Sequence, residues 1–248
     1  MIEILLYPIV LLALLAAIHS YFGLEILRRG VIFTDLAIAQ AAAFGAAISI
    51  AYLGGEYRYA LTLLMALSCG VLIAIISKRD INLEAFIGIL YVFFASAIMI
   101  TLAHSAEGVE HFKSLLANDI LFVMSGEIYE SMAIYLAVAA MMGLFYRRLY
   151  GIYKEILFFS LLAVTVTSSV SLVGVFVVFT LLIAAPFIVY EFGFKRPLIS
   201  SFAIAIIYSI VAVLIAYIFD LPTGFTIVFT GSLVSAMTMI IFSKRATS

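Results

Sequence analysis

Long uncharged apolar runs, separated by short charged loops, constrain this sequence more than any other feature. The runs lie near residues 2–22, 31–53, 59–77, 84–103, 131–146, 155–170, 171–190, 198–219 and 223–242. Crossing a bilayer takes a helix of roughly 20 apolar residues, and 67% of this chain is hydrophobic while only 11% is charged. The sequence therefore predicts an all-α polytopic transmembrane helical bundle. Because no linker or low-complexity tract interrupts it, we expect a single transmembrane domain over residues 1–248.

Basic residues gather in alternate loops, and this pattern sets the predicted topology. Cytoplasmic loops carry an excess of Lys and Arg. Placing these loops inside requires an outside N-terminus, an inside C-terminus and nine crossings. Eight is the alternative if residues 155–190, which we expect to turn at residues 167–169, include a re-entrant element. The loop residues are Arg28, Arg29, Lys78, Arg79, Arg147, Arg148, Lys154, Lys195, Arg196, Lys244 and Arg245, which are eleven of the thirteen Lys and Arg.

The longest segment without a predicted crossing, residues 104–130, is acidic and lies on the predicted outer side. It holds Glu107, Glu110, Asp119, Glu127 and Glu130 against a single lysine. An acidic outer face suits a cationic solute or a basic partner, although acidic residues are also simply tolerated there. Residues 115–124 are mostly apolar but too short to cross, which predicts a short outer re-entrant or interfacial helix.

Several function classes are disfavoured by what the sequence lacks. It has neither the His-Glu-x-x-His pattern of zinc hydrolases nor a phosphate-binding loop of the Gly-x-x-x-x-Gly-Lys-Ser/Thr type. A net charge of −1 disfavours nucleic acid as a partner. We therefore expect no enzyme activity in this chain and no permanently bound cofactor. Any ATP hydrolysis would have to come from a partner chain.

Polar residues inside the predicted crossings are the strongest functional indications, because a carboxylate in hydrocarbon is costly and usually faces a bundle interior or a water path. Asp35 lies about six residues into the second run, roughly 9 Å along a helix, and no other acidic residue is predicted to lie as deep. It is either part of a transport pathway or a buried partner of Arg28 or Arg29. Gln40 follows five residues later, about 140° around an ideal helix from Asp35.

Two further residues are candidates with ordinary structural alternatives. His19 lies near the inner end of the first run, where it can neighbour Asp35 across residues 20–30 or simply pack against its surroundings. Glu84 follows Asn82 by two residues and is expected in the first turn of a helix, where a carboxylate complements the helix dipole. The second run is rich in Ala and Gly, which predicts close helix approach at an interface.

Five segments together resemble the permease subunits of manganese/zinc ABC importers, the ABC-3 type. Residues 220–224, Asp-Leu-Pro-Thr-Gly, are similar to the signature near the family's C-terminus, here carried by Asp220, Pro222 and Gly224. Residues 28–37, 84–89, 115–123 and 174–186 resemble, in order, its second-helix motif, its Glu-Ala-x-Ile-Gly segment, its outer re-entrant segment and its Gly-Val to Pro helix. Each segment is a weak indication alone, but their order is specific.

The resemblance implies a homodimeric, multi-pass permease of the prokaryotic plasma membrane. It would receive Mn²⁺, Zn²⁺ or Fe²⁺ from an extracytoplasmic metal-binding protein and pass it inward, driven by cytoplasmic ABC ATPase subunits. On this reading the outer-face residues for the receptor or the arriving metal are Glu107, Glu110, His111 and Asp119. The candidates for ATPase contact are Arg147, Arg148, Lys154, Lys195 and Arg196. The alternative is an ion-coupled secondary transporter or channel without an ABC ATPase.

The sequence departs from the family pattern in two places. The family's second helix carries an Asp and, four residues on, a His that belong to the metal path. Asp35 matches the Asp, but Ala39 stands at the His position, with Gln40 beside it. An amide oxygen is a harder and weaker ligand than imidazole, which shifts the expected metal modestly from zinc toward manganese or another ion that accepts oxygen ligands. His19, Glu84 and His111 are possible replacement ligands.

The second departure is a short loop where the family usually has about twenty cytoplasmic residues with a helix that docks on the ATPase. Here only residues 149–153 separate Arg148 from Lys154. If an ATPase couples to this chain, we expect it to contact this short loop, residues 191–197 or residues 77–82.

Overall fold

The computed structural model describes residues 2–103, 120 and 123–242, and within these ranges its regular structure is helical, with no strands. The all-α prediction is therefore confirmed. The helices are α1 (Ile2–Arg29), α2 (Thr34–Leu53), α3 (Arg58–Ile76), α4 (Leu83–Leu102), α6 (Ser125–Phe145), α7 (Gly151–Val173), α8 (Val175–Glu191), α9 (Pro197–Phe219) and α10 (Thr223–Phe242).

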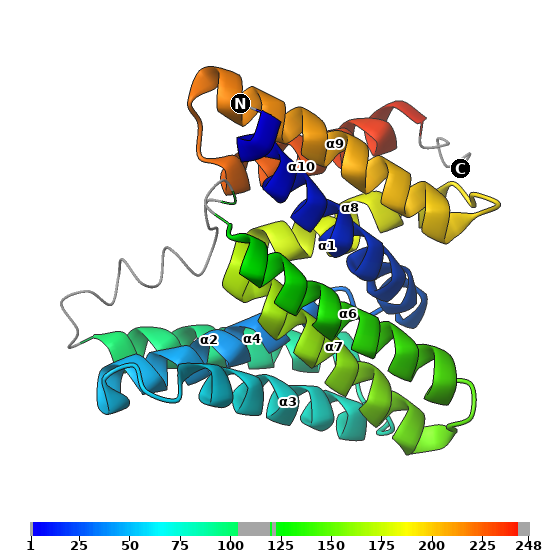
Figure 1. The fold of residues 1–248 in the computed structure, drawn as a ribbon. Helices are drawn as coiled ribbons and strands as arrows, with labels where there is room; N and C mark the ends of the chain where they lie inside the picture. Colours follow the sequence, from blue (N-terminus) through cyan, green and yellow to red (C-terminus); the bar gives the residue numbers. More distant parts are fainter. Residues whose placement is uncertain (1, 104–119, 121–122, 243–248) are drawn as a thin grey trace.

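The helices pack in two groups that share α7 and α1 as connecting elements (Figure 1). In the first group, α2 packs against α3 and α4, and α7 packs against α3 and α2. In the second, α8, α9 and α10 pack against one another, and α1 lies across α8 and α9. α6 contacts α7 on one side and α1 on the other. A single cluster of buried apolar side chains runs through both groups.

Eight of the described helices are long and apolar enough to cross a bilayer, and α8, with 17 residues, is shorter. A helix of that length spans about 25 Å against roughly 30 Å of hydrocarbon. Nine crossings stay a prediction, and α8 belongs to the stretch that the sequence already marked as the uncertain one. Most of the short helix predicted near residues 115–124 lies outside the described residues.

Two predicted boundaries were wrong. α1 does not end near residue 22 but continues to Arg29, because Glu25 pairs with Arg28 and Arg29 at i,i+3 and i,i+4 spacing and supports the added turn. α6 begins at Ser125, where the sequence predicted an outer loop. Its start is capped by Glu127, whose Oε2 accepts a hydrogen bond from the backbone N–H of Met124 at 2.9 Å.

The predicted turn at residues 167–169 was also wrong, because α7 continues through these residues to Val173. The hydroxyls of Thr165, Ser169 and Ser171 donate to backbone carbonyls four residues earlier, which satisfies them inside the helix. The break between α7 and α8 falls at Gly174, with φ 84° and ψ 164°. A residue with a side chain rarely adopts a positive φ of this kind.

Glycine permits two close helix approaches. A Cβ on Gly45 of α2 would overlap the backbone carbonyl of Leu61 on α3. A Cβ on Gly23 of α1 would overlap the carbonyl of Leu182 on α8. That carbonyl has no helical donor because Pro186, four residues later, lacks an N–H. The expectation of close approach along the second helix is thus met at Gly45.

Candidate functional site

Asp35 lies in the first turn of α2 and is 1% exposed. The helix begins at Thr34, so Asp35 is one residue into the helix and not the six that the sequence predicted. The proposed pairing with Arg28 or Arg29 does not occur, because each of these arginines binds Glu25 at 2.8 Å. Asp35 Oδ1 is buried and has no hydrogen-bond partner among the described residues. Burying a carboxylate oxygen without a partner is costly, so this position calls for another explanation.

Glu84 lies at the same end of α2. As predicted, it occupies the first turn of α4, whose N-cap Asn82 accepts a hydrogen bond from the Ala85 N–H at 3.0 Å. Glu84 Oε1 accepts from the backbone N–H of Phe33, just before α2, at 3.3 Å, while its Oε2 is buried with no partner among the described residues. The start of α2 therefore has two carboxylates nearby, those of Asp35 and Glu84.

His19 and Gln40 are buried and each leaves one polar atom without a described partner. His19 Nδ1 lies 2.8 Å from the carbonyl of Leu15. A carbonyl can only accept, so Nδ1 carries the proton and the unpartnered Nε2 keeps a free lone pair. Gln40 is 3% exposed and its Oε1 has no partner. Both atoms are of the kinds that bind divalent metal ions.

These candidates do not form one compact centre. Among the described residues, no group of three or more His, Cys, Asp or Glu is placed to hold a metal ion. His19 belongs to α1, which packs on α8 and α9, whereas Asp35 and Gln40 belong to α2, which packs on α3 and α4. The proximity of His19 and Asp35 stays a prediction. The arrangement fits separate positions along a path better than one tight site.

Charged residues at the ends of α1, α3, α6 and α7 form a paired network, which we call the inner cluster. Arg29 binds Glu25 at 2.8 Å and Glu155 at 3.4 Å, and it donates to the Tyr146 hydroxyl. Lys78 lies 3.6 Å from the other oxygen of Glu155. These contacts bring the ends of three predicted cytoplasmic loops together, which supports their common side.

Tyr146 completes the inner cluster from the end of α6. Its hydroxyl donates to Glu25 Oε2 at 3.2 Å, and burial raises the pKa of this phenol, so that it stays protonated. The Lys154 ammonium lies 4.5 Å from the centre of its ring. The Arg29 guanidinium is also 3.9 Å from the Phe158 ring centre.

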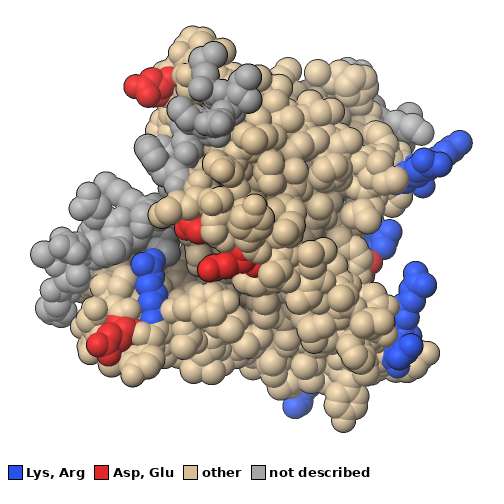
Figure 2. Space-filling view, viewed as in Figure 1, with Lys and Arg blue, Asp and Glu red and all other residues tan. Residues whose placement is uncertain are grey.

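The residues predicted to contact an ATPase lie in the loops beside this cluster. Lys154 is half-buried, whereas the others are exposed. Figure 2 shows most Lys and Arg side chains along the right-hand edge, where Figure 1 places the α6–α7 loop and the start of α9. Acidic side chains lie mainly toward the left and centre of this view. The exposed residues are Arg147, Arg148, Lys195 and Arg196.

A small polar pocket at the opposite end was missed by the sequence analysis. It has a volume of about 240 Å³ and is lined by Glu127 and Glu130 of α6, Ser168 and Ser171 of α7, and residues near them. The signal was the hydroxyl-rich run at residues 165–171, which the sequence analysis interpreted as a turn. The predicted outer-face residues Glu107, Glu110, His111 and Asp119 lie outside the described residues.

The family-signature segment joins α9 to α10. Asp220 ends α9 with φ 53°, a left-handed conformation that Asp tolerates better than most residues. The Pro222 carbonyl accepts from the backbone N–H and the hydroxyl of Thr226, each at 3.0 Å. Gly224 is buried in the first turn of α10. Asp220 is thus the C-cap of α9, and α10 begins three residues later at Thr223.

The eight long apolar helices among the described residues identify a multi-pass membrane protein. The chain belongs to the ABC 3 transport family, whose model matches residues 1–242. This confirms the resemblance found in the sequence and identifies the chain as an ABC transporter permease, a transport subunit.

Solved structures share the fold. PsaBC from Streptococcus pneumoniae, solved in complex with Fab, superposes with a TM-score of 0.77 at 19% identity, covering 98% of this chain and 94% of that chain. A transporter described as metal-chelate ABC type, in an inward-facing conformation, gives a TM-score of 0.70 at 14% identity, covering 96% of this chain and 85% of that chain. A search of curated proteins finds no match.

Proposed function

We propose that this chain is the membrane permease of an ATP-driven importer that carries a divalent transition metal ion, Mn²⁺, Zn²⁺ or Fe²⁺, inward across a prokaryotic plasma membrane. The metal ion is the cargo and not a resident cofactor. The structural neighbour of the metal-chelate type supports a metal-related cargo. Membership of a transport family supports the role of transport subunit.

The observation that carries this proposal is the buried Asp35 carboxylate, whose Oδ1 has no hydrogen-bond partner among the described residues. A buried carboxylate oxygen without a partner is stabilised by a cation, and a divalent ion that leaves water needs anionic oxygen ligands in return. Glu84, with one buried free oxygen near the start of α2, adds a second such ligand. Cargo and site would therefore compensate each other only while the ion passes.

Other positions would serve as earlier steps of the same path. The small polar pocket between α6 and α7 offers the carboxylates of Glu127 and Glu130. Within the bundle, Gln40 offers an amide oxygen and His19 an imidazole nitrogen. Because oxygen donors outnumber nitrogen donors and sulfur is absent from this set, the path favours Mn²⁺ over softer ions. Passage over several weak sites also lets the ion leave as readily as it enters.

The partners follow from the two faces of the bundle. A cytoplasmic ABC ATPase would bind the basic loops that carry Arg147, Arg148, Lys154, Lys195 and Arg196. An extracytoplasmic metal-binding protein would dock on the opposite, acidic face, and a second copy of this chain would complete the permease. Because the loop at residues 149–153 is short, the ATPase would rely on contacts with the loop before α9 as well.

Reconstitution tests the proposal directly. The full chain is placed in liposomes with a candidate ABC ATPase and a candidate metal-binding protein, and uptake of radiolabelled Mn²⁺ and Zn²⁺ is followed. We expect uptake that requires ATP and the binding protein and persists without a proton or sodium gradient. Uptake driven by such a gradient in the absence of ATP would instead support a secondary transporter.

Gln40 tests which ligands select the metal. Replacing it by His supplies an imidazole one residue from the family's His position, so Gln40→His should shift uptake severalfold toward Zn²⁺ relative to Mn²⁺. The matched variant Gln40→Asn keeps an amide oxygen and should keep the Mn²⁺ preference at a lower rate. A competition assay with both labelled metals measures the ratio. An unchanged ratio in Gln40→His would remove Gln40 from the path.

A further inference from the structure

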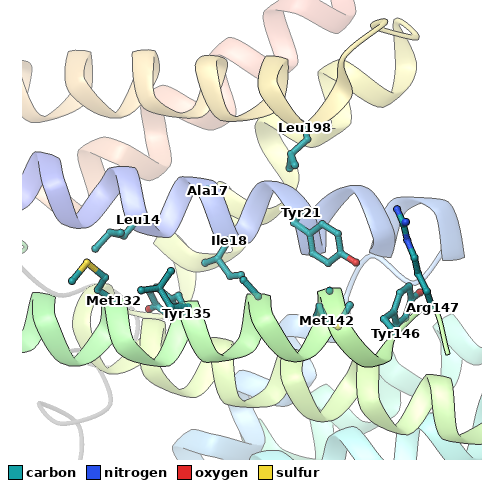
Figure 3. A pocket seen from close by; sticks show the side chains of 13 residues that line it. Leu14, Ala17, Ile18, Tyr21, Met132, Tyr135, Met142, Tyr146, Arg147 and Leu198 are labelled. Carbon is teal, nitrogen blue, oxygen red and sulfur yellow. The ribbon is translucent and has the colours of Figure 1, made fainter. Parts of the chain in front are cut away.

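A groove of about 760 Å³ lies between α1 and α6 and reaches the start of α9. Its walls are almost entirely apolar, with Leu14 and Ile18 on α1, Met132 and Leu136 on α6, and Leu198 on α9 (Figure 3). All three helices are long enough to cross a bilayer. In a membrane this groove therefore faces hydrocarbon. Water would find few polar partners there, and an unfilled groove would forfeit dispersion contacts.

Small residues keep the groove open. Ala17 on α1 and Ala139 on α6 line it and leave room between the two helices. Gly143, one turn after Ala139, also lines it, and a Cβ placed on this glycine would meet no atom within 4 Å. The position beside Gly143 is therefore open, and a Cβ added there displaces no protein atom.

Arg147 is the one charged residue among the described residues that line the groove, and it lies at one end. Tyr21, Tyr146 and Arg147 line the end that lies at the predicted cytoplasmic side, and Figure 3 shows them together at the right of the groove. Tyrosine is enriched where a membrane meets water, because its ring is apolar and its hydroxyl polar. This end of the groove therefore lies at the level of the lipid headgroups.

Arg147 combines an unpaired charge with a place in the groove. Arg29 and Lys78 are paired with carboxylates and Lys154 lies over an aromatic ring. Neither the Arg147 nor the Arg148 side chain has an ion pair or hydrogen bond to a described residue, and of the two only Arg147 lines the groove. An unpaired guanidinium at headgroup level favours an anionic group, and its planar donors match a phosphate.

We infer that the groove between α1 and α6 binds one anionic phospholipid from the cytoplasmic leaflet, with an acyl chain along the groove and the headgroup phosphate on Arg147. From Met132 to the end of α6 at Phe145, two residues before Arg147, the helix rises about 20 Å. Half the hydrocarbon thickness is about 15 Å, so the groove accommodates an acyl chain of one leaflet. A helix from a second protein copy would fill the apolar part but supply no anion unless it carried an acidic residue at this depth.

Native mass spectrometry of the full-length, delipidated permease tests this site. The protein is titrated with phosphatidylglycerol or with phosphatidylcholine carrying the same acyl chains. We expect one tightly retained phosphatidylglycerol, bound at least about fivefold more tightly than phosphatidylcholine. Arg147→Gln should bring the two affinities together, whereas the matched variant Arg148→Gln, one residue outside the groove, should keep the preference.

The acyl-chain part of the site is tested separately. Gly143→Leu adds a side chain that lines the groove and whose Cβ meets open space, and it should remove the retained lipid of either headgroup. Gly126→Leu, at an equally open glycine of α6 away from the groove, should leave it bound. Equal lipid retention in wild type, Arg147→Gln and Gly143→Leu would overturn the inference. A disulfide between two copies of Gly143→Cys in membranes would likewise overturn it, because it would assign the groove to a protein interface.

Discussion

The inner cluster and the start of α2 lie at the same end of the bundle, but among the described residues carboxylates are paired with basic side chains in the first and not in the second. In the cluster, Glu25 and Glu155 are both paired with basic side chains, and Tyr146 is hydrogen-bonded to Arg29 and Glu25. On α2, Asp35 is more deeply buried than either glutamate and has an oxygen with no described partner. α2 is held instead by close apolar packing against α3 and α4.

This difference separates structural charge from functional charge. A buried charged group that is fully paired needs no functional explanation, because the attraction of its partners offsets the cost of removing it from water. A buried carboxylate without a partner destabilises the fold and is retained where a ligand supplies the missing charge. We therefore expect changes in the inner cluster to affect stability, and changes at Asp35 to affect transport.

The largest effect on stability is expected where α2 meets α3. Gly45→Leu forces a side chain into the backbone of Leu61 and should cost about 3 kcal/mol, enough to reduce the yield of folded protein. Thermal melting in detergent measures the loss. Gly88→Leu, at an open glycine of α4, is the matched control and should melt like wild type. Equal melting of both variants would contradict the close contact between α2 and α3.

An intermediate effect is expected from Arg29→Gln in the inner cluster. This change leaves Glu25 and Glu155 without their shared partner in a half-buried position and should cost about 2 kcal/mol. The control Lys78→Gln alters the same network at a side chain that is 45% exposed, and should cost less than about 0.5 kcal/mol. If the two variants lose the same stability in melting experiments, the burial of a basic side chain does not determine how much its ion pairs contribute to stability.

The smallest measurable effect is expected from Tyr146→Phe. The change removes one hydroxyl that accepts from Arg29 and donates to Glu25, while the ring beneath Lys154 remains. The expected cost is about 1 kcal/mol. In the Arg29→Gln background the same change should cost clearly less, which a double-mutant cycle measures. Full additivity would show that the two side chains do not interact.

The sequence was sufficient to predict the helices, because a bilayer demands apolar runs of a set length and loops that carry the charge. The start of α4 at Asn82 was also predictable, since capping is local. The extension of α1 to Arg29 was not predictable from hydropathy, because the added turn is charged and is stabilised by ion pairs of Glu25 with Arg28 and Arg29. The course of α7 through residues 167–169 was missed because hydroxyl groups can satisfy themselves within a helix.

For the candidate site, the sequence indicated burial of Asp35 but not its lack of a partner. Pairing depends on which side chains meet once the helices pack. Arg28 and Arg29 both pair with Glu25, so neither is available to pair with Asp35. The small polar pocket lined by Glu127 and Glu130 was also missed, because it forms only where α6 packs against α7.

Uptake by an Asp35→Asn permease tests the central claim most directly. Asparagine keeps the size and hydrogen-bonding capacity of the side chain but removes the charge that a divalent ion needs, so radiolabelled Mn²⁺ uptake should fall at least about tenfold at equal amounts of folded protein. Glu25→Gln, which removes a paired carboxylate from the inner cluster, should lower stability but keep uptake per folded molecule. Normal uptake by Asp35→Asn would contradict the account and leave Asp35 as a structural residue.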